Sequence, residues 1–170
     1  AARLPHVGHR SDLNYVLGEM VAELNGGLAY VSGGDWLKPE RPRVALLGAE
    51  LALDAAAGRY RIAKILRGQN EEARYRSPLT EVGVDVKEGE YMLAIDGEDL
   101  PGNVDPYKLL RNKADRPVEL TVGATADKAA ARKVKIQPIL SETDLRYLAY
   151  VQKNRERVDQ LYGGRFGYIH

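Results

Sequence analysis

The three histidines are the first candidates for chemistry, because the 170-residue chain contains no cysteine. Disulfides, thiolate metal sites and cysteine nucleophiles are therefore excluded. His6 and His9 lie three residues apart, and His170 is the last residue of the sequence. Two imidazoles without a third ligand nearby are a weak metal signal, since zinc is held by three or four protein ligands. We predict no metal site and no cofactor, and a solvent-facing role for His6 and His9.

Acidic residues gather in one short segment, which contains Asp96, Glu98 and Asp99. A calcium ion takes six to eight oxygen ligands, and this segment supplies too few converging ones. Nor does the sequence contain an evident pair of carboxylates for hydrolysis. The residue types by themselves thus indicate no hydrolytic centre.

Composition limits the class of protein. Apolar residues make up 44% and charged residues 29% of the chain, which is typical of a soluble globular protein. The chain has 25 Lys and Arg residues and 24 Asp and Glu residues, so its net charge is +1. This balance provides no excess of positive charge that would attract nucleic acid or a membrane surface. No apolar run approaches the roughly 20 residues that span a bilayer. We predict a soluble protein and leave its compartment, cytoplasm or periplasm, open.

A helical arm is expected at the start of the chain, in a first region covering residues 1–35. Ser11 and Asp12 are good helix-starting residues, and Asn25-Gly26-Gly27 is a typical end. Between them apolar residues recur at helical spacing: Leu13, Val16, Leu17, Met20, Val21 and Leu24. This stripe needs a partner to cover it. A link rich in proline and charge follows, in which we expect Trp36 to pack against the next region.

Residues 43–139 are predicted to form a β-rich α+β body. Expected strands cover 43–47, 49–53, 59–66, 91–95, 118–122 and 133–137, the later ones alternating apolar with polar residues. Two short helices are expected to begin at Pro78, capped by Ser77, and at Asp105-Pro106. The sum is a partly open barrel of about five or six strands with two short helices.

A second arm is expected over residues 141–170. Ser141 and Asp144 are spaced like a capping box, and the helix that follows should stop at Gly163-Gly164. Residues 165–170 are predicted to begin a strand. Because the chain lacks an initial Met and stops on this apolar run, we expect it to be a piece of a longer protein.

Two motifs of the body carry a family resemblance. Ser77-Pro78-Leu79-Thr80-Glu81-Val82-Gly83, followed by Lys87-Glu88-Gly89-Glu90 and a strand ending in Asp96-Gly97, resembles a PDZ domain. Leu79 stands where the family usually has Ala, and Glu90 where Asp is commoner. The resemblance implies a sheet edge that receives an extended peptide, with the terminal carboxylate held by backbone N–H groups.

The matching carboxylate-binding loop is a run of six residues: Leu46, Leu47, Gly48, Ala49, Glu50 and Leu51. Gly48 would let the backbone approach a ligand closely, whereas Glu50 would repel a carboxylate if it pointed inward. Alternatively, Gly48 only bends a strand. Peptide binding at this loop and a purely structural role therefore both remain open.

The flanks narrow the resemblance to tricorn-type serine peptidases, within the tail-specific or C-terminal-processing protease superfamily. The matching segments are Asp12-Leu13-Asn14-Tyr15, the run from Glu23 to Asp35, and Gly167-Tyr168-Ile169-His170. The family's catalytic His falls at Leu28, and an aliphatic side chain cannot accept a proton. Its nucleophilic Ser and acidic partner would lie beyond His170. The resemblance thus implies that this chain alone has no peptidase activity and no catalytic residue.

Three functions are compatible with this sequence. The first is a non-catalytic PDZ-like module that binds extended peptides or protein C-termini, positions the remaining protease core domains, or does both. The second is a fragment of an active peptidase whose nucleophile lies on another chain, and the third is a free-standing PDZ adaptor. The apolar faces of the terminal helices also make self-association plausible.

Overall fold

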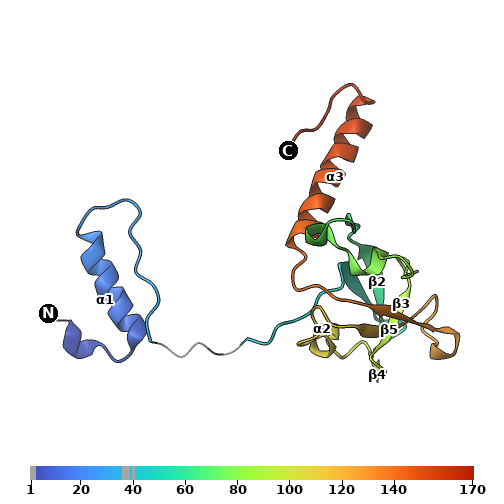
Figure 1. Ribbon diagram of the computed structural model, residues 1–170, viewed down its shortest axis with the longest axis horizontal. Helices are drawn as coiled ribbons and strands as arrows, with labels where there is room; N and C mark the ends of the chain where they lie inside the picture. The colour runs from blue at the N-terminus through green and yellow to red at the C-terminus, as the bar shows by residue number, and fades with distance from the viewer. Residues whose placement is uncertain (1–2, 36–38, 40) are drawn as a thin grey trace. The chain divides into compact units, whose positions relative to one another are not determined.

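The computed structural model describes residues 3–35, 39 and 41–170, and it divides into two compact units, Ala1–Arg41 and Pro42–His170 (Figure 1). Trp36, which was expected to pack the link against the body, lies outside the described residues. Within the described residues, no helix is both long enough and apolar enough to cross a bilayer.

The first unit contains a 3-10 turn, η1 (Leu4–His6), and the helix α1 (Arg10–Ala22). α1 begins one residue before the predicted start, with His9 in the N-cap position. The Asp12 carboxylate accepts hydrogen bonds from the backbone N–H groups of Gly8, at 3.0 Å, and His9, at 3.2 Å. These bonds satisfy donors that the helix itself leaves free. No residue of α1 is buried within this unit.

The second unit is a six-stranded antiparallel sheet with helices around it (Figure 1). Its strands are β1 (Ala49–Asp54), β2 (Arg59–Ile65), β3 (Tyr91–Ile95), β4 (Glu98–Asp99), β5 (Val118–Gly123) and β6 (Arg132–Ile136). They lie in the order β1-β2-β3-β5-β6, and β4 also pairs with β3. The helices are α2 (Pro106–Leu109) and α3 (Thr143–Tyr162), with 3-10 turns η2 (Ala73–Tyr75), η3 (Pro78–Thr80) and η4 (Lys128–Ala130). The predicted β-rich α+β fold is confirmed.

The core lies around β3, whose five residues are all buried. β5 buries Val118, Leu120 and Val122 and leaves the residues between them half exposed, as its alternating sequence predicts. Asp96 and Gly97, with φ of 51° and 81°, form the two-residue turn that joins β3 to β4. Positive φ at both positions suits the twist of a tight antiparallel hairpin.

Some predicted elements differ from the structure. Residues 43–47 form no continuous strand but only two isolated bridges, Val44 with Arg111 and Leu46 with Ile139. The chain bends at Gly48, and regular pairing with β2 starts only after it. Ser77 does not cap a helix, because its hydroxyl donates to the Leu66 carbonyl at 2.6 Å. β4 was not predicted, since two residues are too few to show a period.

The helix α3 ends at Gly163 (φ 57°), as expected, but the predicted capping box at its start is wrong. The N-cap residue is Glu142, not Ser141. Asp144 does not reach back to the cap but pairs with Arg74 of η2, at 2.9 Å. The side chain of Glu142 is thus free of a local capping role.

Residues 165–170, predicted to begin a strand, form none. They run back beside α3 (Figure 1), where the ring of His170 lies 5.2 Å from that of Tyr147 and 5.5 Å from that of Tyr150. Asn154 also donates a hydrogen bond to the Tyr168 hydroxyl, at 3.1 Å. A β-strand must pair with a neighbouring strand, and residues 165–170 pair with none of the described strands. Their aromatic side chains pack on the helix instead.

Candidate functional site

The loop that was predicted to bind a carboxylate, residues 46–51, is buried at its centre, from Leu47 to Ala49. Leu47 and Ala49 are 1% and 2% exposed and belong to the hydrophobic core. Leu51 is partly buried against the same core. Gly48, between Leu47 and Ala49, has a φ of +70°, a backbone conformation that residues with a side chain rarely adopt. The side chains of Leu47 and Ala49 are therefore not available to a ligand.

Part of this backbone is already hydrogen-bonded. The Leu46 N–H donates to the Ile139 carbonyl at 2.7 Å, and the Ile139 N–H donates back to the Leu46 carbonyl at 2.9 Å. The Gly48 carbonyl accepts from the Leu66 N–H at 2.8 Å. The loop is thus joined to the segment that precedes α3.

A carboxylate does occupy the loop, and it belongs to the chain itself. The Gly48 N–H donates to Oε1 of Glu142 at 2.9 Å. The other oxygen, Oε2, accepts from Nη2 of Arg146, one helical turn later, at 2.7 Å. Glu142 is only 4% exposed. Burying a carboxylate is costly unless it is hydrogen-bonded and paired, and both conditions are met here.

The groups around Glu142 come from three elements. Tyr107 lies on α2, where the Asp105 carboxylate caps the helix by accepting from the Tyr107 N–H at 2.9 Å. Burial, and after it the negative charge of Glu142, raise the pKa of the Tyr107 hydroxyl. Glu50, on β1, is half exposed and lies 3.9 Å from Nη1 of Arg146. Arg146 therefore stands between the carboxylates of Glu142 and Glu50.

Close packing surrounds Gly48 on its other side. A Cβ atom at this position would lie 3.1 Å from Cδ of Pro78 and 3.3 Å from Cδ1 of Leu145. Leu145, in the first turn of α3, is 1% exposed. The glycine therefore lets both the Pro78 turn and the start of α3 approach the loop.

The second half of the predicted loop is the start of β1, which lies at one end of the strand order and pairs only with β2. Its outer edge has no strand partner among the described residues. An edge strand offers unpaired N–H and C=O groups to any extended segment.

Sequence reasoning missed Glu142 and Arg146. The spacing of the two residues, i and i+4, is the usual signal for an ion pair on a helix. What the sequence does not signal is that the acidic member reaches Gly48, which lies 94 residues earlier.

The position matched to a catalytic histidine, Leu28, is 85% exposed in the first unit. His9 takes part in the capping of α1, with its Nδ1 2.6 Å from the Ser11 hydroxyl. The described residues contain no cluster of three or more His, Asp or Glu side chains able to hold a metal ion.

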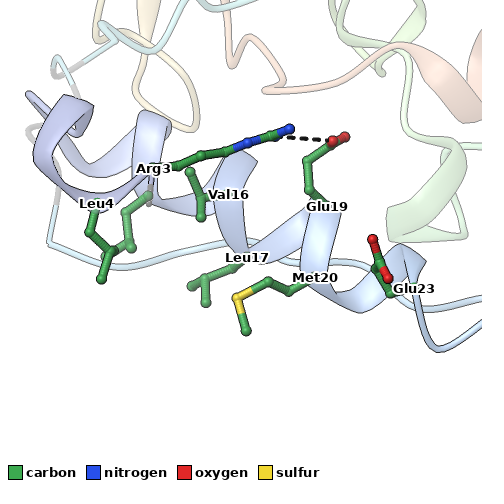
Figure 2. A pocket seen from close by; sticks show the side chains of 8 residues that line it. Arg3, Leu4, Val16, Leu17, Glu19, Met20 and Glu23 are labelled. Carbon is green, nitrogen blue, oxygen red and sulfur yellow. Dashed lines mark hydrogen bonds and ion pairs between the residues drawn. The ribbon is translucent and has the colours of Figure 1, made fainter. Parts of the chain in front are cut away.

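A second surface lies on α1, where apolar side chains line a shallow pocket. Figure 2 shows Leu4, Leu17 and Met20 on the same side of the helix. Arg3 and Glu19 form an ion pair at its margin, at 3.3 Å. Met20 is 62% exposed and Leu4 is 54% exposed, so the unit itself does not cover this face.

Comparison with known proteins relates the whole chain to one group. The chain is 35% identical over 167 residues to a tricorn protease homolog of Saccharolobus solfataricus, and 35% identical over 169 residues to tricorn protease homolog 1 of Streptomyces coelicolor. Each match covers 98% of this chain but only 15% of the relative. A crystal structure of the tricorn protease, 28% identical, superposes with a TM-score of 0.80 over 98% of this chain and 16% of that one.

Residues 45–141 match the family described as the tricorn protease PDZ domain. The matched range begins before the Gly48 loop and ends after β6, so it takes in the whole sheet. The chain therefore belongs to the tricorn protease family and carries its PDZ domain.

Proposed function

We propose that this chain is a non-catalytic PDZ module that positions the core domains of a tricorn-type serine peptidase. The observation that carries the proposal is the antiparallel bridge between Leu46 and Ile139, with hydrogen bonds of 2.7 and 2.9 Å. It fastens the segment leading into α3 to the loop that a PDZ domain would otherwise offer to a ligand. To position a neighbouring domain, the segment that leads into α3 must be held rigidly against the PDZ domain, and this bridge holds it.

Further contacts support a fixed start for α3. Leu145 is buried where the loop, the Pro78 turn and Gly68 meet. Asp144 pairs with Arg74 at 2.9 Å, although this pair is exposed and contributes little by itself. The buried leucine and the backbone bridge should therefore supply most of the rigidity.

Catalysis is assigned to other parts of the peptidase. The relatives are named proteases, and this chain spans about 15% of their length. Leu28 stands where the resemblance requires a proton acceptor, so the first unit lacks a general base at that position. We expect the chain alone to leave fluorogenic peptides uncleaved. Hydrolysis that copurifies with the chain and survives repeated purification would contradict this assignment.

The positioning role is testable by NMR residual dipolar couplings on the chain. If α3 is fixed to the sheet, couplings from residues 143–155 and from β1–β6 will fit one alignment tensor. If the helix needs a separate tensor of smaller magnitude, α3 is mobile and the proposal fails. Residues 10–22 provide an internal reference for a helix outside the second unit.

Peptide recognition at residues 46–51 is a second candidate function. It is favoured by the outer edge of β1, which has no strand partner among the described residues. Binding of protein C-termini would use the same loop that now holds Glu142. The two candidates are thus linked through one residue.

For the apolar face of α1 we propose a partner within the same peptidase, namely its core domains. The chain's matches cover small parts of much longer proteins, which supports an occupant from outside these 170 residues. Self-association through this face is the alternative. Sedimentation velocity between 5 and 500 μM, on the order of a 100-fold range around micromolar dissociation constants, distinguishes them. A concentration-independent monomer supports the first, and a dimer abolished by Met20→Glu supports the second.

A further inference from the structure

We propose that Glu142 is a built-in ligand of the PDZ loop, which the C-terminal carboxylate of an extended peptide must displace in order to bind. The inference rests on the proposed positioning function and deepens it, because the same residue would both anchor α3 and close the peptide site. It starts from the buried contact between the Gly48 N–H and Oε1 of Glu142, at 2.9 Å.

The chemistry offered to Glu142 is the chemistry that a peptide terminus would need. A backbone N–H at a glycine and a guanidinium group, from Arg146 at 2.7 Å, contact the two carboxylate oxygens separately. Charge-assisted hydrogen bonds of this kind are about twice as strong as neutral ones. A free peptide carboxylate carries the same charge and the same two acceptor oxygens. The internal and the external carboxylate therefore compete for one set of donors.

The edge of the sheet beside the buried contact is open to an added strand. The outer edge of β1 has no strand partner among the described residues, so a peptide could add there as a further strand. An incoming carboxylate would take the Gly48 N–H from Glu142. Arg146 would remain as the counter-ion, and it already lies 3.9 Å from Glu50 on β1.

Displacement of Glu142 would be transmitted to the helix. Glu142 is the N-cap residue of α3 and lies between two other anchors in the sequence, Ile139 and Leu145. A peptide that ejects its side chain removes one of three neighbouring contacts that fix the start of α3. Peptide binding and α3 anchoring are therefore negatively coupled, and by linkage each weakens the other by the same factor.

The first test measures peptide affinity by fluorescence polarisation on the full chain. The probes are labelled Ala-Ala-Ala-Ala-Leu with a free C-terminus and the same peptide with an amidated C-terminus. Glu142→Ala should bind the free acid at least 10-fold more tightly than the unmodified chain does, with no gain for the amide. Glu142→Gln keeps the side chain's shape and should give a smaller gain in the same direction.

A matched control is Asp144→Asn, which removes a negative charge two residues away and breaks a contact with Arg74 instead of the loop. It should leave affinity unchanged. In the Glu142→Ala background, Arg146→Gln should abolish the gain, because the peptide carboxylate then loses its counter-ion. Equal affinity of the unmodified chain, Glu142→Ala and Glu142→Gln for the free acid overturns the proposal, whether that affinity is measurable or absent.

The outcome for the positioning function is separate. If Glu142→Ala gains no affinity while α3 of the unmodified chain shares one alignment tensor with the sheet, the built-in ligand fails and the positioning role stands. If α3 is already mobile in the unmodified chain, the positioning role fails whatever the peptides do.

Discussion

Gly48 combines two demands on one residue, a positive φ and close approach by its neighbours. A side chain there would add the strain of φ +70° to contacts of 3.1 Å with Pro78 and 3.3 Å with Leu145. Gly58 shares the first demand, with φ +60°, but a Cβ there would meet nothing within 4 Å. Comparing substitutions at Gly48 and Gly58 therefore distinguishes the cost of backbone strain from the cost of crowding.

We predict that Gly48→Ala lowers the free energy of unfolding by roughly 2–5 kcal/mol, from about 1–2 for the left-handed conformation and 1–3 for overpacking. Gly58→Ala should cost only about 1–2 kcal/mol. Urea unfolding followed by circular dichroism measures both. Equal costs for the two variants would show that crowding at Gly48 is relieved without penalty.

Glu90, at the position where the PDZ pattern more often has Asp, forms an ion pair with Arg132. Its two oxygens lie 2.6 and 2.9 Å from the guanidinium nitrogens, and Oε2 also accepts from the Lys87 N–H at 2.8 Å. Arg132 holds the pKa of the Glu90 carboxyl below its ordinary value of 4.5, although burial acts in the opposite direction. The longer side chain thus ties the turn before β3 to β6.

This pair predicts a particular dependence of stability on pH. Because the pKa of Glu90 is lower in the folded state than in the unfolded chain, its contribution is complete above about pH 4.5 and is lost as pH falls through the folded value. Glu90→Gln should therefore be less stable than the unmodified chain at pH 7 and lose less on going to pH 3. Urea midpoints at both pH values test this.

Glu98 serves as the control for that experiment, since it forms no ion pair or side-chain hydrogen bond among the described residues. Glu98→Gln should follow the pH dependence of the unmodified chain. Parallel curves for the Glu90 variant and the unmodified chain would mean that Glu90 does not contribute to acid sensitivity.

At the scale of elements, α3 is buried at its start and more exposed toward its other end. Leu145 is 1% exposed, whereas Leu161, near the other end, is 65% exposed. The only fully buried residue of this 20-residue helix is Leu145. A single side chain therefore fixes the helix to the sheet, in addition to the bridge at Ile139 and the contact of Glu142.

Leu145→Ala is predicted to undock the first turn of α3. Removing a buried leucine costs roughly 2–5 kcal/mol, and here the loss should fall mainly on the docking of the helix. Hydrogen exchange should rise at residues 146–150 and at Gly48, whose N–H bonds to Glu142. Leu161→Ala, in the same helix, should change neither. Unchanged protection at Gly48 in Leu145→Ala would contradict this view of the anchor.

At the scale of the whole molecule, the buried apolar core belongs to one of the two units. All described apolar side chains that are buried lie between Ala45 and Leu145, and α1 contributes none. A helix of 13 residues with no buried face is marginal in water. The two units should therefore differ strongly in their stability.

A chain of residues 42–170 is accordingly predicted to fold by itself. Its urea midpoint should match that of the full chain, because deletion of residues 1–41 removes none of the described core. Amide exchange in the full chain should be fast in α1 and slow in β3 and β5. A truncated chain that is unfolded, or a fully protected α1, would show that the first unit contributes to the stability of the second.

The sequence by itself determined the local features of this protein. The alternation in β5, the Asp96-Gly97 turn and the glycine end of α3 were all predicted, because period, turn chemistry and capping depend on residues within a few positions of one another. The same holds for Gly48 as the special residue of its loop. The family resemblance followed from the spacing of such local motifs.

Only the tertiary structure decided what meets Gly48. The i, i+4 spacing of Glu142 and Arg146 is that of an ordinary ion pair on a helix, yet the first of them reaches a backbone N–H 94 residues away. Such contacts depend on how β1, the Pro78 turn and α3 pack around one another, and no local pattern encodes that distance. Residues 165–170 show the same limit, since an apolar run becomes a strand only where a neighbouring strand is present to share its hydrogen bonds.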